Sequence, residues 1–148
     1  MRSLLTVTLC LLLMACSATQ RPDTTKGKPA LTGVIWELTN IQSKGDSTDL
    51  PRAPGLYTLE FRKEGSVAIR ADCNRGRGNW ANEKADQLNI TQLNATRAMC
   101  IPRSLHDQFL SDLNDTRSFT LADGKLYLAT KADGSILEFF SGRAMQVE

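Results

Sequence analysis

Histidine, net charge and long apolar runs are all scarce in this sequence. The chain of 148 residues has a single histidine, His106, and its formal net charge is only +2. One histidine argues against a histidine-rich metal centre, and it leaves a Ser–His catalytic triad no second histidine to choose from. A charge of +2 lacks the concentrated basic excess that is typical of phosphate-binding proteins. We therefore expect no metal, no cofactor and no nucleic-acid partner.

The longest apolar run lies at the N-terminus and is short. Residues Leu4 to Leu13 are apolar apart from two threonines, whereas a transmembrane helix needs about 20 apolar residues. A basic start followed by such a run is typical of a signal peptide. The run ends in Leu13-Met14-Ala15-Cys16, which resembles the bacterial lipoprotein box, where the cysteine receives the lipid. Ordinary cleavage after Ala18 is the alternative.

These features divide the chain into three predicted segments. Residues 1–15 form a lipoprotein signal peptide, residues 16–30 a polar, flexible tether, and residues 31–148 one folded domain. Lipid on Cys16 would bind the protein to a membrane. By resemblance to bacterial lipoproteins, Ser17 after the cysteine favours the outer membrane over retention in the inner membrane. We expect an envelope protein that faces the periplasm.

Cysteine is also rare, with four in the chain. Cys10 lies in the predicted signal peptide and Cys16 at its end, so Cys73 and Cys100 form the one remaining pair. In an oxidising compartment this pair is expected to form a disulfide, which would stabilise the fold by about 3–4 kcal/mol. Two free thiols are the alternative. A redox-active role is not expected, because the chain has no C-x-x-C motif.

Alternating apolar residues predict strands along most of the domain. The expected strands are Val34–Ile41, Leu56–Arg62, Ser66–Ala71, a short strand starting at Trp80, another over Leu88–Leu93, then Ser118–Leu121, Leu126–Thr130 and Ile136–Phe140. Turns at Lys63-Glu64-Gly65, Asp123-Gly124 and Asp133-Gly134 predict hairpins. The last strand, Ile136–Phe140, has apolar residues at both odd and even positions, which predicts that it is buried on both faces.

Two other segments of the domain are expected to lie outside strands. Cys73–Asn79 is predicted to be a loop, in which Gly76 and Gly78 permit positive φ angles. The long stretch Ser43–Gly55 is also predicted to be a loop, because turn-forming residues crowd into it.

One helix is predicted, over Pro102–Asn114. Its apolar stripe consists of Leu105, Phe109, Leu110 and Leu113. Ser104 is expected to cap its N-terminus, with Asp107 three residues later, as in a capping box. His106 lies off the stripe and is expected in solvent, with a catalytic role as the alternative. The fold class is therefore α+β: a curled antiparallel sheet, or partial barrel, of about seven or eight strands with one helix packed on it.

Several short motifs resemble one family. They are Trp36-Glu37-Leu38, Leu59-Glu60-Phe61, Cys73-Asn74 followed by Gly78, Thr96-Arg97-Ala98-Met99-Cys100, Leu126-Tyr127-Leu128 and Leu137-Glu138-Phe139. Over residues 31–141 the chain resembles the META domain of HslJ-like heat-shock proteins. It departs from the family at Asp72, where glycine is more usual, and at Ala98, which separates Arg97 from Met99. The resemblance implies a small exported or lipid-anchored protein linked to stress and antibiotic tolerance, and it implies no catalytic residues.

A basic cluster is the candidate binding site of the domain. The candidate binding residues are Arg70, Asn74, Arg75, Arg77, Trp80 and Arg97, and the charge of the four arginines would steer an acidic partner. The alternative is that these arginines are only solvated.

The predicted function is a non-catalytic envelope lipoprotein that binds an envelope protein or supports the envelope. The alternatives are a carrier of a lipid or other apolar ligand and a small hydrolase inhibitor that uses the basic loop. An enzyme is not expected, because carboxylates such as Asp72 and Asp86 show no pairing with a base or nucleophile.

Overall fold

The computed structural model describes residues 31–45, 47–131 and 134–142. The predicted signal peptide (residues 1–15), the predicted tether (residues 16–30) and the lipidation site at Cys16 lie outside the described residues. They therefore stay predictions.

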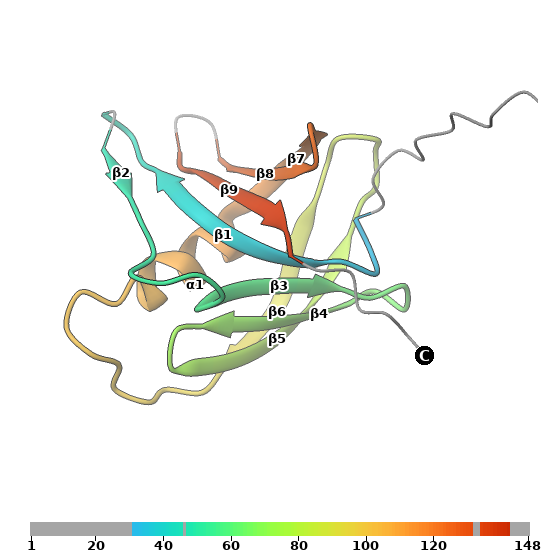
Figure 1. The fold of residues 1–148 in the computed structure, drawn as a ribbon. Helices are drawn as coiled ribbons and strands as arrows, with labels where there is room; N and C mark the ends of the chain where they lie inside the picture. The colour runs from blue at the N-terminus through green and yellow to red at the C-terminus, as the bar shows by residue number, and fades with distance from the viewer. Residues whose placement is uncertain (1–30, 46, 132–133, 143–148) are drawn as a thin grey trace, which may run out of the picture.

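The described chain forms one antiparallel sheet and one helix (Figure 1). In chain order the elements are β1 (Ile35–Gln42), β2 (Thr48–Asp49), β3 (Tyr57–Phe61), β4 (Ser66–Ala71), β5 (Asn74–Ala81), β6 (Asn89–Ala95), α1 (His106–Asp115), β7 (Thr116–Ala122), β8 (Lys125–Thr130) and β9 (Ile136–Ser141). The strand order is β6-β5-β4-β3-β1-β9-β8-β7, and β2 pairs with β1. The predicted α+β class with a curled antiparallel sheet is confirmed, although the predicted loop over Ser43–Gly55 contains the short β2.

The two ends of the sheet meet along only part of their length. The Leu88 N–H donates to the Arg117 C=O (3.1 Å), and the Phe119 N–H donates to the Asp86 C=O (2.9 Å). These bonds join the segment before β6 to the start of β7. The later part of β6 instead lies beside α1. The sheet is therefore a partial barrel with a seam that the helix borders.

Large apolar side chains fill the interior. Trp36, Phe61, Phe109 and Phe139 are among the fully buried residues. Phe109 comes from the predicted helical stripe, and its ring centroid lies 5.3 Å from that of Tyr57 and 6.2 Å from that of Phe139. Full burial of such a side chain stabilises a fold by about 1.5–3 kcal/mol. The helix thus closes the core on the concave side of the sheet.

The prediction of a loop over Cys73–Asn79 is wrong, because β5 begins at Asn74. Gly76 and Gly78 are strand residues, and neither has a positive φ angle. A Cβ atom on Gly76 would lie 3.0 Å from the Asn94 carbonyl oxygen, and one on Gly78 would lie 3.0 Å from the Thr91 carbonyl oxygen. The glycines are therefore needed for the close approach of β6. Trp80, expected to start a strand, lies near the end of β5.

The start of the helix also differs from the prediction. Helix α1 begins at His106, and no side chain caps its N-terminus. The Ser104 hydroxyl instead lies 3.2 Å from the Tyr57 hydroxyl, so it is engaged with β3. The predicted end at Asn114-Asp115 agrees with the structure.

The last strand, β9, is buried on one face only, contrary to the prediction. Leu137 and Phe139 are fully buried, but Ile136 is 42% exposed and Phe140 is 40% exposed. The reason is that the core and α1 cover only the concave face of the sheet. The Asp123-Gly124 turn has positive φ at both residues (51° and 75°), as its sequence predicts. Asp133, in the second Asp-Gly turn, lies outside the described residues.

Candidate functional site

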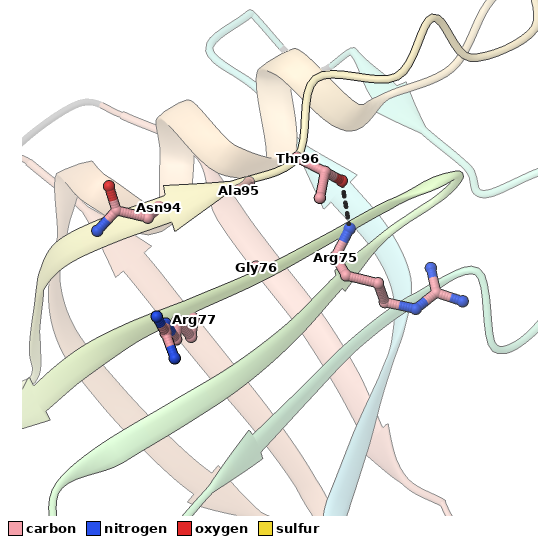
Figure 2. A pocket seen from close by; sticks show the side chains of 6 residues that line it. All are labelled: Arg75, Gly76, Arg77, Asn94, Ala95 and Thr96. Atoms are coloured by element: carbon pink, nitrogen blue, oxygen red, sulfur yellow. Dashed lines mark hydrogen bonds between the residues drawn. The ribbon is translucent and has the colours of Figure 1, made fainter.

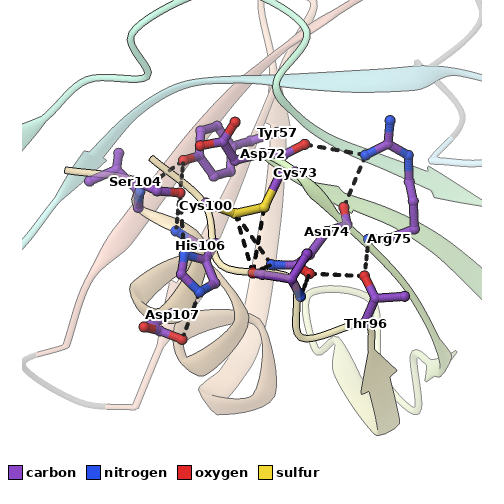
Figure 3. Close-up of a disulfide and its surroundings, with 12 residues drawn as sticks. Tyr57, Asp72, Cys73, Asn74, Arg75, Thr96, Cys100, Ser104, His106 and Asp107 are labelled. Atoms are coloured by element: carbon purple, nitrogen blue, oxygen red, sulfur yellow. Dashed lines mark hydrogen bonds and ion pairs between the residues drawn. A yellow bond between two sulfur atoms is a disulfide. The ribbon is translucent and has the colours of Figure 1, made fainter. Parts of the chain in front are cut away.

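The predicted Cys73–Cys100 disulfide is present and joins two segments that are distant in sequence (Figure 3). Cys73 immediately precedes β5, and Cys100 ends the extended segment 96–100 that follows β6. The two Cα atoms are 5.6 Å apart. The covalent bond therefore fixes the far end of this segment beside the start of β5.

Asn74 fixes the same segment through hydrogen bonds. Its Oδ1 accepts from the Ala98 N–H (2.7 Å) and the Thr96 hydroxyl (2.9 Å). Its Nδ2 donates to the Ala98 C=O (3.2 Å) and contacts the Cys100 sulfur (3.3 Å). Asn74 is fully buried. This residue was predicted to bind a partner, but its role in the structure is to hold the segment in place. Its amide pairs with Ala98 as a neighbouring strand would.

Asp72 occupies a position that suits glycine. Its φ angle is 56°, which costs most residues about 1–2 kcal/mol and which Asp tolerates better than most. The carboxylate is buried; Oδ1 accepts from Arg52 Nη2 (3.0 Å), while Oδ2 has no hydrogen-bond partner among the described residues. Glycine would adopt this backbone conformation without strain.

Three of the predicted basic residues share the convex face of the sheet. Arg70 and Arg75 are cross-strand partners on β4 and β5, and Arg77 lies two residues further along β5. A shallow hollow of about 400 Å³ lies over the β5–β6 pair. Figure 2 shows Arg75 and Arg77 among the residues that line it. Arg75 Nη1 donates to the carbonyls of Asp72 (3.2 Å) and Asn74 (3.1 Å). Part of its hydrogen-bonding capacity is thus used within the β4–β5 turn.

The structure does not bring the other predicted residues to this face. The Trp80 ring packs edge-on against Phe61, with the centroids 5.6 Å apart, and its Nε1 donates to the Arg62 C=O (2.9 Å). Trp80 is therefore a residue at the edge of the core. Arg97 lies in the segment after β6. The six predicted residues do not form a single surface.

A larger hollow borders Arg97 on the other side of β6. Its volume is about 680 Å³, and it lies between residues 93–100 and the first half of α1, including His106, Asp107 and Leu110. Met99 is 99% exposed at this hollow, and Ile101, just beyond the disulfide, is 52% exposed. We call this hollow the α1–β6 groove. The sequence signal for it was the pair of apolar residues flanking Cys100, which the basic-cluster hypothesis left out.

Ser104, His106 and Asp107 form a short chain of contacts at the start of α1 (Figure 3). Ser104 Oγ lies 3.2 Å from His106 Nδ1, and His106 Nε2 lies 3.1 Å from Asp107 Oδ1. Asp107 is 93% exposed, so it does not hold the imidazole as a buried triad carboxylate does.

The Ser104 hydroxyl belongs to a hydrogen-bond chain that fixes the helix start. Tyr57 Oη accepts from the Leu105 N–H (2.8 Å) and lies 3.2 Å from Ser104 Oγ. His106 was expected in open solvent, but its side chain is half-buried. The contacts of Tyr57 with Ser104 and Leu105 thus connect the start of α1 to β3.

The described residues contain neither a metal-binding cluster nor a membrane-spanning helix. Residues 31–45, 47–131 and 134–142 contain no group of three or more His, Cys, Asp or Glu side chains placed to hold a metal ion. No helix in these ranges is long and apolar enough to span a membrane.

Comparison with known proteins gives a family and two similar folds. The META domain family model matches residues 29–144. An NMR structure of a protein from Burkholderia xenovorans has a TM-score of 0.62 and 21% sequence identity, over 76% of this chain and 83% of that chain. A crystal structure of a DUF4847 family protein from Bacteroides vulgatus has a TM-score of 0.54 and 15% identity, over 78% of this chain and 96% of that chain. At these identities the likeness shows the fold alone. No curated protein matches the chain.

Proposed function

The chain belongs to the META domain family, and we propose that it is a non-catalytic binding module of the bacterial cell envelope, held at the membrane by lipid on Cys16. The observation that carries this proposal is the fixed segment 96–100, which exposes Met99 between two anchors. Asn74 holds Ala98 on one side, and the disulfide holds Cys100 on the other. A partner that binds a preorganised segment avoids part of the ordering entropy that binding otherwise costs.

The exposure of Met99 points to an interaction rather than to a role in folding. At 99% exposure its side chain buries almost no surface within this domain. Burying such a side chain stabilises by about 1.5–3 kcal/mol, which here is available to a partner. Methionine is also flexible and adaptable, which suits it to binding surfaces.

The envelope location is supported by the sequence. The basic start, the apolar run and the box ending at Cys16 are those of a lipoprotein precursor, and the disulfide fits an oxidising compartment such as the periplasm. We place the protein on the outer membrane, facing the periplasm. By family resemblance we assign it to stress response and antibiotic tolerance.

The two alternative functions have weaker support. A carrier of an apolar ligand needs interior space, but Trp36, Phe61 and Phe139 pack into the centre of the described domain. A hydrolase inhibitor that uses the basic loop needs its arginines together, but Arg97 lies away from Arg75 and Arg77, across β6.

Site-specific photo-crosslinking in living cells tests the proposal. A photoreactive amino acid replaces Met99 in the full chain; the matched control replaces Thr120, which is exposed on β7. We expect one discrete protein adduct from position 99 and none from position 120. Arg97→Glu should weaken the adduct, because it reverses a charge in the α1–β6 groove. Equal adducts from both positions, or none from position 99, would contradict the proposal.

A further inference from the structure

The α1–β6 groove is bordered by a strand whose pairing with β5 continues beyond β6 itself. The Thr96 N–H donates to the Arg75 C=O at 2.9 Å. Two residues later, the Ala98 N–H and C=O both bond to the side-chain amide of Asn74. Thr96 and Ala98 thus direct their backbone groups towards β5.

The residues between them face the other way. In an antiparallel ladder, successive residues direct their N–H and C=O groups alternately to the two sides of the strand. Ala95 and Arg97 therefore direct theirs away from β5, towards the groove. In the described part of the chain, no backbone hydrogen bond joins these groups of Ala95 and Arg97 to another strand, turn or loop. The end of β6 and its continuation to Arg97 therefore form an unpaired sheet edge, which we call the free edge of β6.

The groove has room for a peptide beside this edge. Its volume of about 680 Å³ lies within the range of about 300–1,000 Å³ that is typical of ligand sites. Its far wall is formed by α1, which leaves the edge open rather than covering it. Proteins often protect exposed edges with lysine or proline, and residues 94–98 contain neither.

The charges of the groove favour an acidic occupant. Arg97 makes no ion pair with any described residue, whereas Asp107, on the helix wall, already contacts His106 at 3.1 Å. The same charges disfavour a second copy of this chain, since pairing β6 with β6 would bring two Arg97 side chains together.

We propose that the free edge of β6 binds an extended, acidic segment of a partner protein as an added strand, paired with the backbone of Ala95 and Arg97. Strand addition of this kind takes affinity from main-chain hydrogen bonds and specificity from alternate side chains. Apolar side chains of the segment would contact Leu93, Leu110 and Met99, which line the groove. The inference rests on the proposed function and specifies the chemistry of the partner segment.

Peptide binding to the full chain in detergent micelles tests the inference. The probe is a fluorescent heptapeptide of alternating glutamate and valine, and the control has lysine in place of glutamate. Two further probes carry N-methyl groups at the odd or at the even positions. An added strand uses the backbone N–H groups of alternate residues to pair with its neighbour. One methylated probe should therefore bind like the unmethylated peptide, and the other should bind at least about tenfold more weakly.

Protein variants provide the matched comparison. Arg97→Glu should weaken binding of the acidic probe by on the order of tenfold, whereas Lys63→Glu, the same charge change in the exposed β3–β4 turn, should leave it unchanged. Equal binding of both methylated probes, or of the lysine control, would overturn the inference, and so would self-association of the chain through β6 in sedimentation. If the probes fail but Met99 still crosslinks a partner, only the strand-addition inference falls; if both fail, the proposed function falls with it.

Discussion

One buried amide side chain, that of Asn74, determines the shape of the proposed binding segment. Asn74 was recognised from the sequence because it follows Cys73, but it was interpreted as part of a basic binding surface. Its partners, Thr96 and Ala98, lie more than 20 positions away. Such a contact depends on how β5 and β6 pair, so the role of this residue could not be predicted from its neighbours in sequence.

Replacing Asn74 with alanine should destabilise the domain by about 2–4 kcal/mol, because its buried amide makes the hydrogen bonds that hold Thr96 and Ala98. Urea unfolding monitored by tryptophan fluorescence measures this change. Asn79→Ala is the control, since Asn79 is exposed and its side chain bonds to Gln92 at the surface; it should change stability by less than about 0.5 kcal/mol. Equal losses in the two variants would contradict the role given to Asn74.

Asp72→Gly should raise the free energy of unfolding by about 1 kcal/mol. Glycine adopts a φ of 56° without strain, and the exposed partner Arg52 contributes little through its ion pair. Arg52→Ala should have the opposite sign, because it leaves both oxygens of a buried carboxylate unpartnered. Thermal unfolding of the two variants and of the double variant tests this pair. A loss of stability in Asp72→Gly would show that the ion pair outweighs the backbone strain.

Local signals decided which secondary-structure elements could be predicted. The β3–β4 hairpin and the Asp123-Gly124 turn follow from alternation and from turn residues that are adjacent in sequence. Most of β5 was missed because its glycines look like turn residues. They are instead needed because β6 lies too close to leave room for a Cβ atom. The one-sided burial of β9 likewise depends on what covers each face of the sheet, which alternation alone does not show.

Gly78→Ala should destabilise the domain by about 1–3 kcal/mol, because the new Cβ would lie 3.0 Å from the Thr91 carbonyl oxygen of β6. Ala81→Val, at the exposed end of the same strand, is the control and should have little effect. Chemical denaturation measures both. Unchanged stability of Gly78→Ala would mean that β6 can move away from β5 at little cost.

An ion pair between β8 and β9 should give the domain part of its acid sensitivity. Lys125 Nζ lies 2.6 Å from Glu138 Oε1, and hydrogen bonds from Lys125 and Asn40 lower the pKa of Glu138. Because the folded-state pKa is depressed, this stabilisation is present above the unfolded-state pKa and is lost as pH falls through the folded-state pKa. Glu138→Gln should therefore cost about 0.5–1 kcal/mol at neutral pH, and the difference from wild type should shrink on acidification. A difference that stays constant with pH would contradict this assignment.

At the scale of the whole molecule, the class of the fold and the disulfide were predictable, but the groove was not. Alternation, a single helical stripe and one remaining cysteine pair were enough for the α+β class and for the Cys73–Cys100 bond. The α1–β6 groove arises because residues 86–88 close the sheet against β7, while α1 lies along the rest of β6. That arrangement depends on the curvature of the entire sheet.

Intact-mass analysis of the protein purified from membranes tests the central claim most directly, namely that this is a lipid-anchored envelope module with a disulfide-held binding segment. We predict a chain that begins at Cys16 and carries lipid there, with Cys73 and Cys100 alkylated only after reduction. A chain that retains its N-terminal residues, has no lipid and has freely alkylated cysteines would contradict the account.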